Sequence, residues 1–97
     1  MTIEKNIEGT TACLKLNGWL DTQTAPQLEE EIAALESNIT ALILDFAELE
    51  YISSAGMRQL VSAYKKMNGK LTLRNVSAEV MSVISMTGLD KRIAIEK

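Results

Sequence analysis

The sequence predicts an α/β fold: a single mixed sheet of four to five strands with parallel β-α-β crossovers and three helices packed on it. Apolar runs and segments of helical periodicity follow one another as strand, strand, helix, strand, helix, strand, helix and a final short strand. Strands that are separated by helices pair in parallel, and the helices pack on the resulting sheet. The 97 residues suffice for one modest core. Residues 1–97 are therefore expected to form a single domain.

The chain opens with two short apolar runs, Ile3–Ile7 and Ala12–Leu16. The residues between them, Glu8–Thr11, are turn-prone, so the two runs predict a β-hairpin. Asn17 and Gly18 follow the second run and are expected to end its strand.

The first helix is predicted to begin at Thr24, which would act as its N-cap. Pro26 suits the first turn of a helix, and Gln27 stands where a capping box places a side chain that reaches back to the N-cap. One face of this helix is apolar and is expected to be buried; its residues are Leu28, Ile32 and Leu35.

The run Thr40–Phe46 is apolar almost throughout, which is typical of a central strand covered on both faces. A second helix is predicted from Ala55 to a stop at Asn68 and Gly69. Its inner face follows the spacing i, i+3, i+4 and i+7, at Met57, Leu60, Val61 and Tyr64.

The last third of the chain predicts a strand, a helix and a short strand. Lys70–Asn75 has the composition of a strand, and Ala78–Met86 that of a helix closed by Gly88. Arg92–Ile95 is expected to add a short final strand.

Composition excludes several classes of function. Ten Lys and Arg against thirteen Asp and Glu give a net charge of -3, so no nucleic acid partner is expected. No apolar run approaches the ~18 residues that span a bilayer, and the first residues lack a signal-peptide core, so we expect a cytoplasmic protein without a membrane partner. Histidine is absent and Cys13 is the only cysteine. We therefore expect no metal, no cofactor, no disulfide and no His-dependent catalysis.

Two adjacent hydroxyls, Ser53 and Ser54, stand where an apolar strand gives way to the second helix. The first amides of a helix lack partners and carry the positive end of the macrodipole, so an anion is stabilised there. Arg58, one turn beyond Ser54, is placed to neutralise such a charge. A serine at this position is also a common N-cap worth ~1 kcal/mol, so the residues alone leave a cap and a phosphate site both open.

Two motifs resemble those of the STAS-domain anti-sigma factor antagonists, the anti-anti-sigma factors of bacterial partner-switching systems. Leu16–Asp21, followed by Ala25 and Leu28, is similar to the family's Gly-x-Leu-Asp loop and the helix after it. Leu44–Phe46 followed by Tyr51–Met57 is similar to the strand, loop and helix that carry the regulatory serine. The resemblance covers essentially the whole chain and implies the STAS fold.

The resemblance also implies a switch. Residue on residue, Ser54 takes the phosphorylation position, and Ser53, where many relatives have Asp, is the less favoured acceptor and is expected to be the cap. Unphosphorylated, such a protein binds an anti-sigma factor that is itself a serine kinase; phosphorylated, it lets go, and a PP2C-type phosphatase resets it. No P-loop or kinase motif is present, so the chain is expected not to be an enzyme. It is expected to be a monomer.

The surface expected to face the partner comprises Asp21, Ser53, Ser54, Gly56, Met57, Arg58 and Met86. Asp21 is otherwise a loop carboxylate, and Gly56 either permits a close backbone approach or is a tolerated helix glycine. Met57 fits the inner face of its helix, whereas Met86 lies off the inner face of the third helix. Trp19 is either a partner anchor or a semi-buried aromatic covering the hairpin.

Two other classes of function stay open. A STAS domain can be a structural subunit of a transporter-associated or signalling complex, in which case Ser54 is never phosphorylated. A small α/β enzyme with a serine nucleophile is disfavoured, because the chain has neither histidine nor a Gly-x-Ser-x-Gly motif.

Overall fold

The computed structural model describes residues 1–96, which form five strands, three α-helices and one short 3-10 helix. In chain order the elements are β1 (Thr2–Glu8), β2 (Thr11–Leu20), α1 (Ala25–Ala33), β3 (Ala41–Ile52), α2 (Ser54–Lys66), β4 (Leu71–Arg74), α3 (Ala78–Met86), η1 (Leu89–Lys91) and β5 (Ala94–Glu96). This order confirms the predicted succession of strands and helices.

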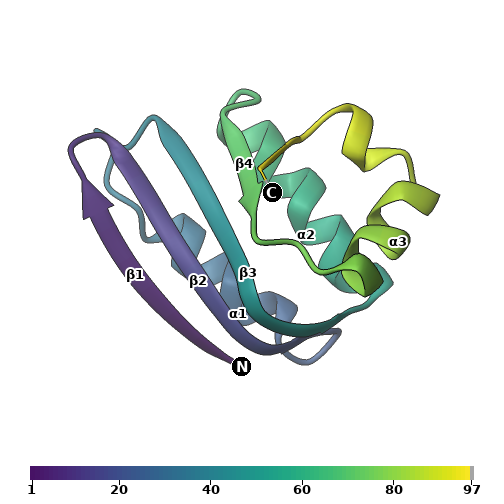
Figure 1. Cartoon of the computed structure of the whole chain (residues 1–97). Coiled ribbons are helices and arrows are strands. Elements are labelled where there is room, and N and C mark those ends of the chain that lie inside the picture. Colours follow the sequence, from purple (N-terminus) through teal and green to yellow (C-terminus); the bar gives the residue numbers. More distant parts are fainter. Residues whose placement is uncertain (97) are drawn as a thin grey trace.

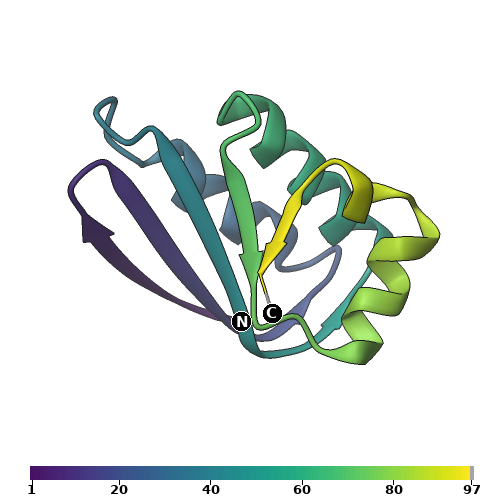
Figure 2. The same cartoon turned by 45° about the horizontal axis from the view of Figure 1, so that its top comes forward.

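The strands form one mixed sheet in the order β1-β2-β3-β4-β5 (Figure 1 and Figure 2). β1 and β2 form the predicted antiparallel hairpin, and every other neighbouring pair is parallel. The last strand begins at Ala94, later than predicted, because Arg92 still has the helical dihedrals that close η1.

The helices cover one face of the sheet only. Each crossover steps in the same direction from one strand to the next, and right-handed crossovers of that kind place their helices on the same side. From Ala41 to Phe46 the side chains of β3 alternate between half-buried, as at Ile43, and buried, as at Leu44. The prediction that Thr40–Phe46 is covered on both faces is therefore wrong: a continuous apolar run does not show how many faces are covered.

The core lies between the sheet and the helices. No polar or charged side chain within the described residues is buried in it. Its largest fully buried side chains are Leu14, Leu16, Leu20, Leu28, Leu42, Leu44, Phe46, Leu60, Leu71, Leu73 and Ile84. Burial of one such side chain stabilises the fold by about 1.5–3 kcal/mol, so this layer fixes the positions of α1 and α2.

The second strand continues past Asn17 and Gly18, contrary to prediction. Gly18 has a φ of 112°, and the β2–β3 register shifts between Lys15 and Asn17 and again between Gly18 and Trp19. These irregularities bend β2 without ending it. As a result β2 reaches Leu20 and runs alongside the end of β3.

The predicted capping box at the start of α1 does not form. Thr24 is the N-cap residue, but its φ and ψ of -99° and -16° are helical rather than extended, and its hydroxyl caps no amide of the helix. That hydroxyl instead donates to the Trp19 carbonyl at 2.7 Å and accepts from the Asp21 amide at 2.8 Å. Gln27 donates to the Met1 carbonyl at 2.9 Å. Thr24 and Gln27 thus bind neighbouring segments instead of each other.

Candidate functional site

The start of α2 separates the two serines into different environments. Ser53 has extended dihedrals, and its Oγ accepts a long hydrogen bond of 3.4 Å from the Gly56 amide, which confirms the predicted cap. Ser54 is the first helical residue, and its side chain is exposed. The hydroxyl that is free to react is therefore that of Ser54.

The loop that carries Asp21 packs against this helix start. The Ser53 amide donates to the Leu20 carbonyl at 2.9 Å. A Cβ on Gly56 would lie 2.8 Å from the same carbonyl oxygen and 2.7 Å from Cγ1 of Ile52, closer than real Cβ contacts. Gly56 is thus confirmed as the residue that permits a close backbone approach. The two motifs found in the sequence meet at this point.

Asp21 orders its own loop. Its Oδ1 accepts from the amides of Gln23 at 3.0 Å and Thr24 at 3.1 Å, and its backbone carbonyl accepts from the Ala25 amide at 2.8 Å. The side chain is half-buried. These bonds hold the loop in the shape that meets α2, while contact of Asp21 with a partner stays a prediction.

A hollow of about 360 Å³, which we call the α2–α3 groove, begins at Ser54. One wall consists of Ser54, Met57, Arg58 and Val61, and the other of Val83, Thr87 and Leu89. Met57 is only 6% exposed, so it is the most deeply buried residue of its wall. Met86, three residues beyond Val83 on α3, is 84% exposed. The groove thus joins an exposed hydroxyl to apolar side chains.

Arg58 is the cation of this groove. Within residues 1–96 the one ion pair joins Arg74 to Glu96 at 3.2 Å, so the exposed guanidinium of Arg58 has no carboxylate partner. Of the seven residues expected to face a partner, the structure thus gathers Ser54, Met57 and Arg58 in one groove. It leaves the role of each as a prediction.

Sequence reasoning missed Tyr51. Trp19 and Tyr51 are register partners on β2 and β3, with ring centroids 5.2 Å apart and exposed fractions of 56% and 46%. Trp19 therefore belongs to a strand and is exposed, so it is not a semi-buried loop aromatic that covers the hairpin. Parallel pairing of the two strands alone does not place Tyr51 beside Trp19, because the register shifts twice along β2 before it reaches Trp19.

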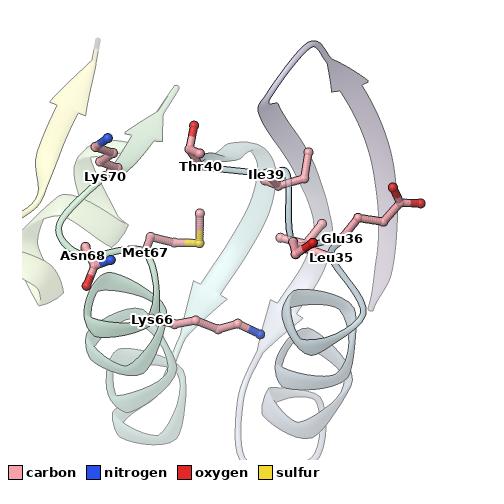
Figure 3. Close-up of a pocket in the computed structure, with 9 residues that line it drawn as sticks. Leu35, Glu36, Ile39, Thr40, Lys66, Met67, Asn68 and Lys70 are labelled. Carbon is pink, nitrogen blue, oxygen red and sulfur yellow. The ribbon is translucent and has the colours of Figure 1, made fainter.

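A second hollow, of about 390 Å³, opens between the C-terminal ends of α1 and α2 (Figure 3). Leu35, Ile39 and Met67 supply its apolar wall. Lys66 extends across it from α2 toward α1, and its Nζ donates to the Ile32 carbonyl at 3.0 Å. Ser54 starts the same 13-residue helix at its other end, roughly 18 Å away. This hollow is therefore separate from the α2–α3 groove.

Cys13 lies on the sheet face without helices. Burial raises the pKa of its thiol, the nearby carboxylates of Asp45 and Glu8 raise it further, and Arg74 opposes them. The thiol is therefore protonated near neutral pH, which disfavours nucleophilic chemistry.

Comparison with known families shows which family this chain belongs to. A sequence model of the STAS domain matches residues 2–97. The chain belongs to the STAS domain family. Within the residues that the structure describes, no helix has the length and apolarity needed to span a bilayer.

Several proteins named as anti-sigma factor antagonists are similar to this one. BtrV of Bordetella bronchiseptica, whose name as an anti-sigma factor antagonist is provisional, is 33% identical over 92 residues, which cover 91% of this chain and 78% of BtrV. The anti-sigma-B factor antagonist of Bacillus subtilis is 27% identical over 100 residues, covering 98% and 92% of the two chains. The crystal structure of an anti-sigma factor antagonist from Mycobacterium paratuberculosis matches with a TM-score of 0.87 at 26% identity, covering 98% of this chain and 84% of that one.

Proposed function

We propose that this STAS protein is an anti-sigma factor antagonist whose binding is switched by phosphorylation of Ser54. With Ser54 unmodified it binds an anti-sigma factor that is a serine kinase; with Ser54 phosphorylated it releases that partner. The observation that carries the proposal is the exposed Ser54 at the first position of α2, on the rim of the α2–α3 groove. The names of the similar proteins support the class of partner.

The phosphoryl transfer takes only a hydroxyl from this chain. The γ-phosphoryl group of ATP forms a bond to Ser54 Oγ, the hydroxyl proton passes to a base of the kinase, and ADP leaves. A PP2C-type phosphatase reverses the modification with water and releases inorganic phosphate. In this proposal the protein acts by binding, as a cytoplasmic monomer, and contributes no catalytic group.

A phosphate at this position acts on the partner more than on the fold. It adds a charge of about -1.5 to -2, and the unpaired amides at the start of α2 stabilise an anion there. α2 can thus stay folded while the charge on its exposed rim changes sign. A partner surface that packs against Ser54 then loses a desolvated contact.

Mapping the acceptor tests this proposal. The cognate kinase, incubated with ATP and with the wild type, Ser54→Ala or Ser53→Ala, is expected to label the wild type and Ser53→Ala but not Ser54→Ala. Ser53→Ala is the matched control, because it removes the neighbouring hydroxyl and costs only a cap of ~1 kcal/mol. Phosphopeptide mass spectrometry reads the site. Undiminished labelling of Ser54→Ala would rule Ser54 out, and a stable native complex that contains no kinase would favour a scaffold role.

A further inference from the structure

Arg58 is an exposed cation on the same wall of the α2–α3 groove as Ser54, and it has no carboxylate partner among residues 1–96. We infer that Arg58 is a shared ligand: it binds a carboxylate of the partner while Ser54 is free, and it binds the phosphate once Ser54 is phosphorylated. This inference rests on the proposed function and adds the chemistry of the partner segment and the means of its release.

The helix geometry puts Arg58 on the same face of α2 as Ser54, one turn further along. Residues four apart lie on the same face of a helix, and side chains lean toward its N-terminus. Arg58 stands on the C-terminal side of Ser54, so the lean carries its side chain toward the serine. A guanidinium binds phosphate through two parallel hydrogen bonds, which makes arginine better suited than lysine to this contact.

The groove defines what the partner presents in the unphosphorylated state. Its apolar surface comes from Met57, Val61, Val83 and Leu89, and its rim carries the positive charge of Arg58. Charge complementarity therefore favours a segment of the kinase that inserts an apolar side chain and has an Asp or Glu beside it. The apolar contact supplies burial, and the carboxylate fixes the orientation of the segment.

Phosphorylation then acts twice on this contact. The phosphate is tethered one turn away from Arg58, so it competes with the partner's carboxylate for the guanidinium without any loss of translational freedom. The same phosphate also places a negative charge beside the partner's carboxylate, where like charges repel. Release follows from an exchange of ligands at Arg58 together with this repulsion.

The first arm of the test needs no partner. Chains with phosphoserine incorporated at position 54 during translation are titrated by phosphorus NMR at 0.15 M salt, as wild type, Arg58→Gln, Arg58→Lys and Lys65→Gln. The second pKa of the phosphate is expected to rise by about 0.3 in Arg58→Gln and by less in Arg58→Lys. Lys65→Gln removes the same charge from the same helix beyond the screening length and is expected to match the wild type. Equal midpoints for the wild type and Arg58→Gln would overturn the inference.

The second arm uses the purified cognate kinase. Arg58→Gln is expected to weaken binding of the unphosphorylated chain about 3- to 10-fold, and phosphorylation is expected to cause a smaller fold-loss in Arg58→Gln than in the wild type. Unchanged affinity of Arg58→Gln would overturn the shared role while leaving release by phosphorylation intact. Conversely, if phosphorylation leaves the wild-type affinity unchanged, the proposed function fails and the exchange fails with it, even where the first arm shows that Arg58 binds the phosphate.

Discussion

Gly56 shows at the scale of one residue why the start of α2 tolerates so little change. Alanine is normally favoured over glycine inside a helix by about 1 kcal/mol. Here the added Cβ would meet the Leu20 carbonyl at 2.8 Å, and a backbone carbonyl cannot rotate away as a side chain does. The steric cost therefore exceeds the gain in helix propensity.

We expect Gly56→Ala to lower the free energy of unfolding by about 1–3 kcal/mol, the usual range for overpacking. Urea unfolding followed by circular dichroism measures it. Ser62→Ala, at an exposed position of the same helix, is the control and is expected to change stability by at most about 0.5 kcal/mol. A Gly56→Ala variant as stable as the control would show that the close approach to Leu20 is not required.

At the same scale, Cys13 leads to a prediction of how the stability of the fold depends on pH. Because burial and the Asp45 carboxylate raise the pKa of its thiol, the folded chain loses the thiol proton at a higher pH than the unfolded chain, whose thiol has a pKa of ~8.5. As pH rises through that range the unfolded state ionises first, so this group lowers stability in alkali. Alkylation by iodoacetamide is expected to show a higher pH midpoint in folded protein than in urea-unfolded protein. Equal midpoints would contradict the assignment.

At the scale of elements, α1 and α2 are tied by side chains as well as by the core. Gln59 Nε2 donates to Glu29 Oε2 at 2.9 Å, and Lys66 Nζ donates to the Ile32 carbonyl at 3.0 Å. The second bond adds a charged donor to a carbonyl in the last turn of α1, which also accepts from the Leu35 amide at 3.2 Å. Lys66 thereby joins the ends of two helices.

Lys66→Ala is expected to cost about 1–1.5 kcal/mol of unfolding free energy, the value of a hydrogen bond to a charged group at a partly exposed site. Lys65→Ala is the matched control, because Lys65 also lies in the last turn of α2 but donates no such bond in the described structure. Both variants lose the same interaction with the helix dipole, so the difference between their urea midpoints reports the bond. Identical midpoints would show that the bond contributes nothing.

The elements with strong local signals were predictable from sequence. α3 has the predicted bounds because its apolar spacing and the glycine after it are both local signals. The bend at Gly18 and the dual role of Thr24 were missed, because each depends on a neighbouring segment: β3 in one case and the Trp19 carbonyl in the other. The helices cover only one face of the sheet because the strands follow one another in sequential order. The apolar run of β3 gives no information about that order.

The candidate site likewise has some features that were predictable from local sequence and others that depend on distant segments. The order of the two serines, with Ser53 as cap and Ser54 as the exposed neighbour, followed from the strand-to-helix transition and from the family resemblance. The groove beyond Ser54 was not predictable, since it forms only where α3 and η1 come to lie beside α2. The pairing of Trp19 with Tyr51 likewise required the register of two distant strands.

At the scale of the whole molecule, the sequential strand order predicts that the proposed phosphorylation of Ser54 would change the surface and leave the fold in place. The helices and the core share one side of the sheet (Figure 2). Ser54, the first residue of α2, is exposed to solvent. No core side chain has to move when Ser54 gains a phosphate. The switch is therefore expected to act on binding rather than on folding.

Calorimetry of the cognate kinase with unphosphorylated chain, phosphorylated chain and Ser54→Ala tests the central claim most directly. We expect Ser54→Ala to bind like the unphosphorylated chain and the phosphorylated chain to bind at least about 10-fold more weakly, because roughly 1.4 kcal/mol of repulsion in a desolvated contact suffices for that ratio. Melting temperatures of the three forms serve as the control for folding. Equal affinity of all three forms for the kinase would contradict the switch.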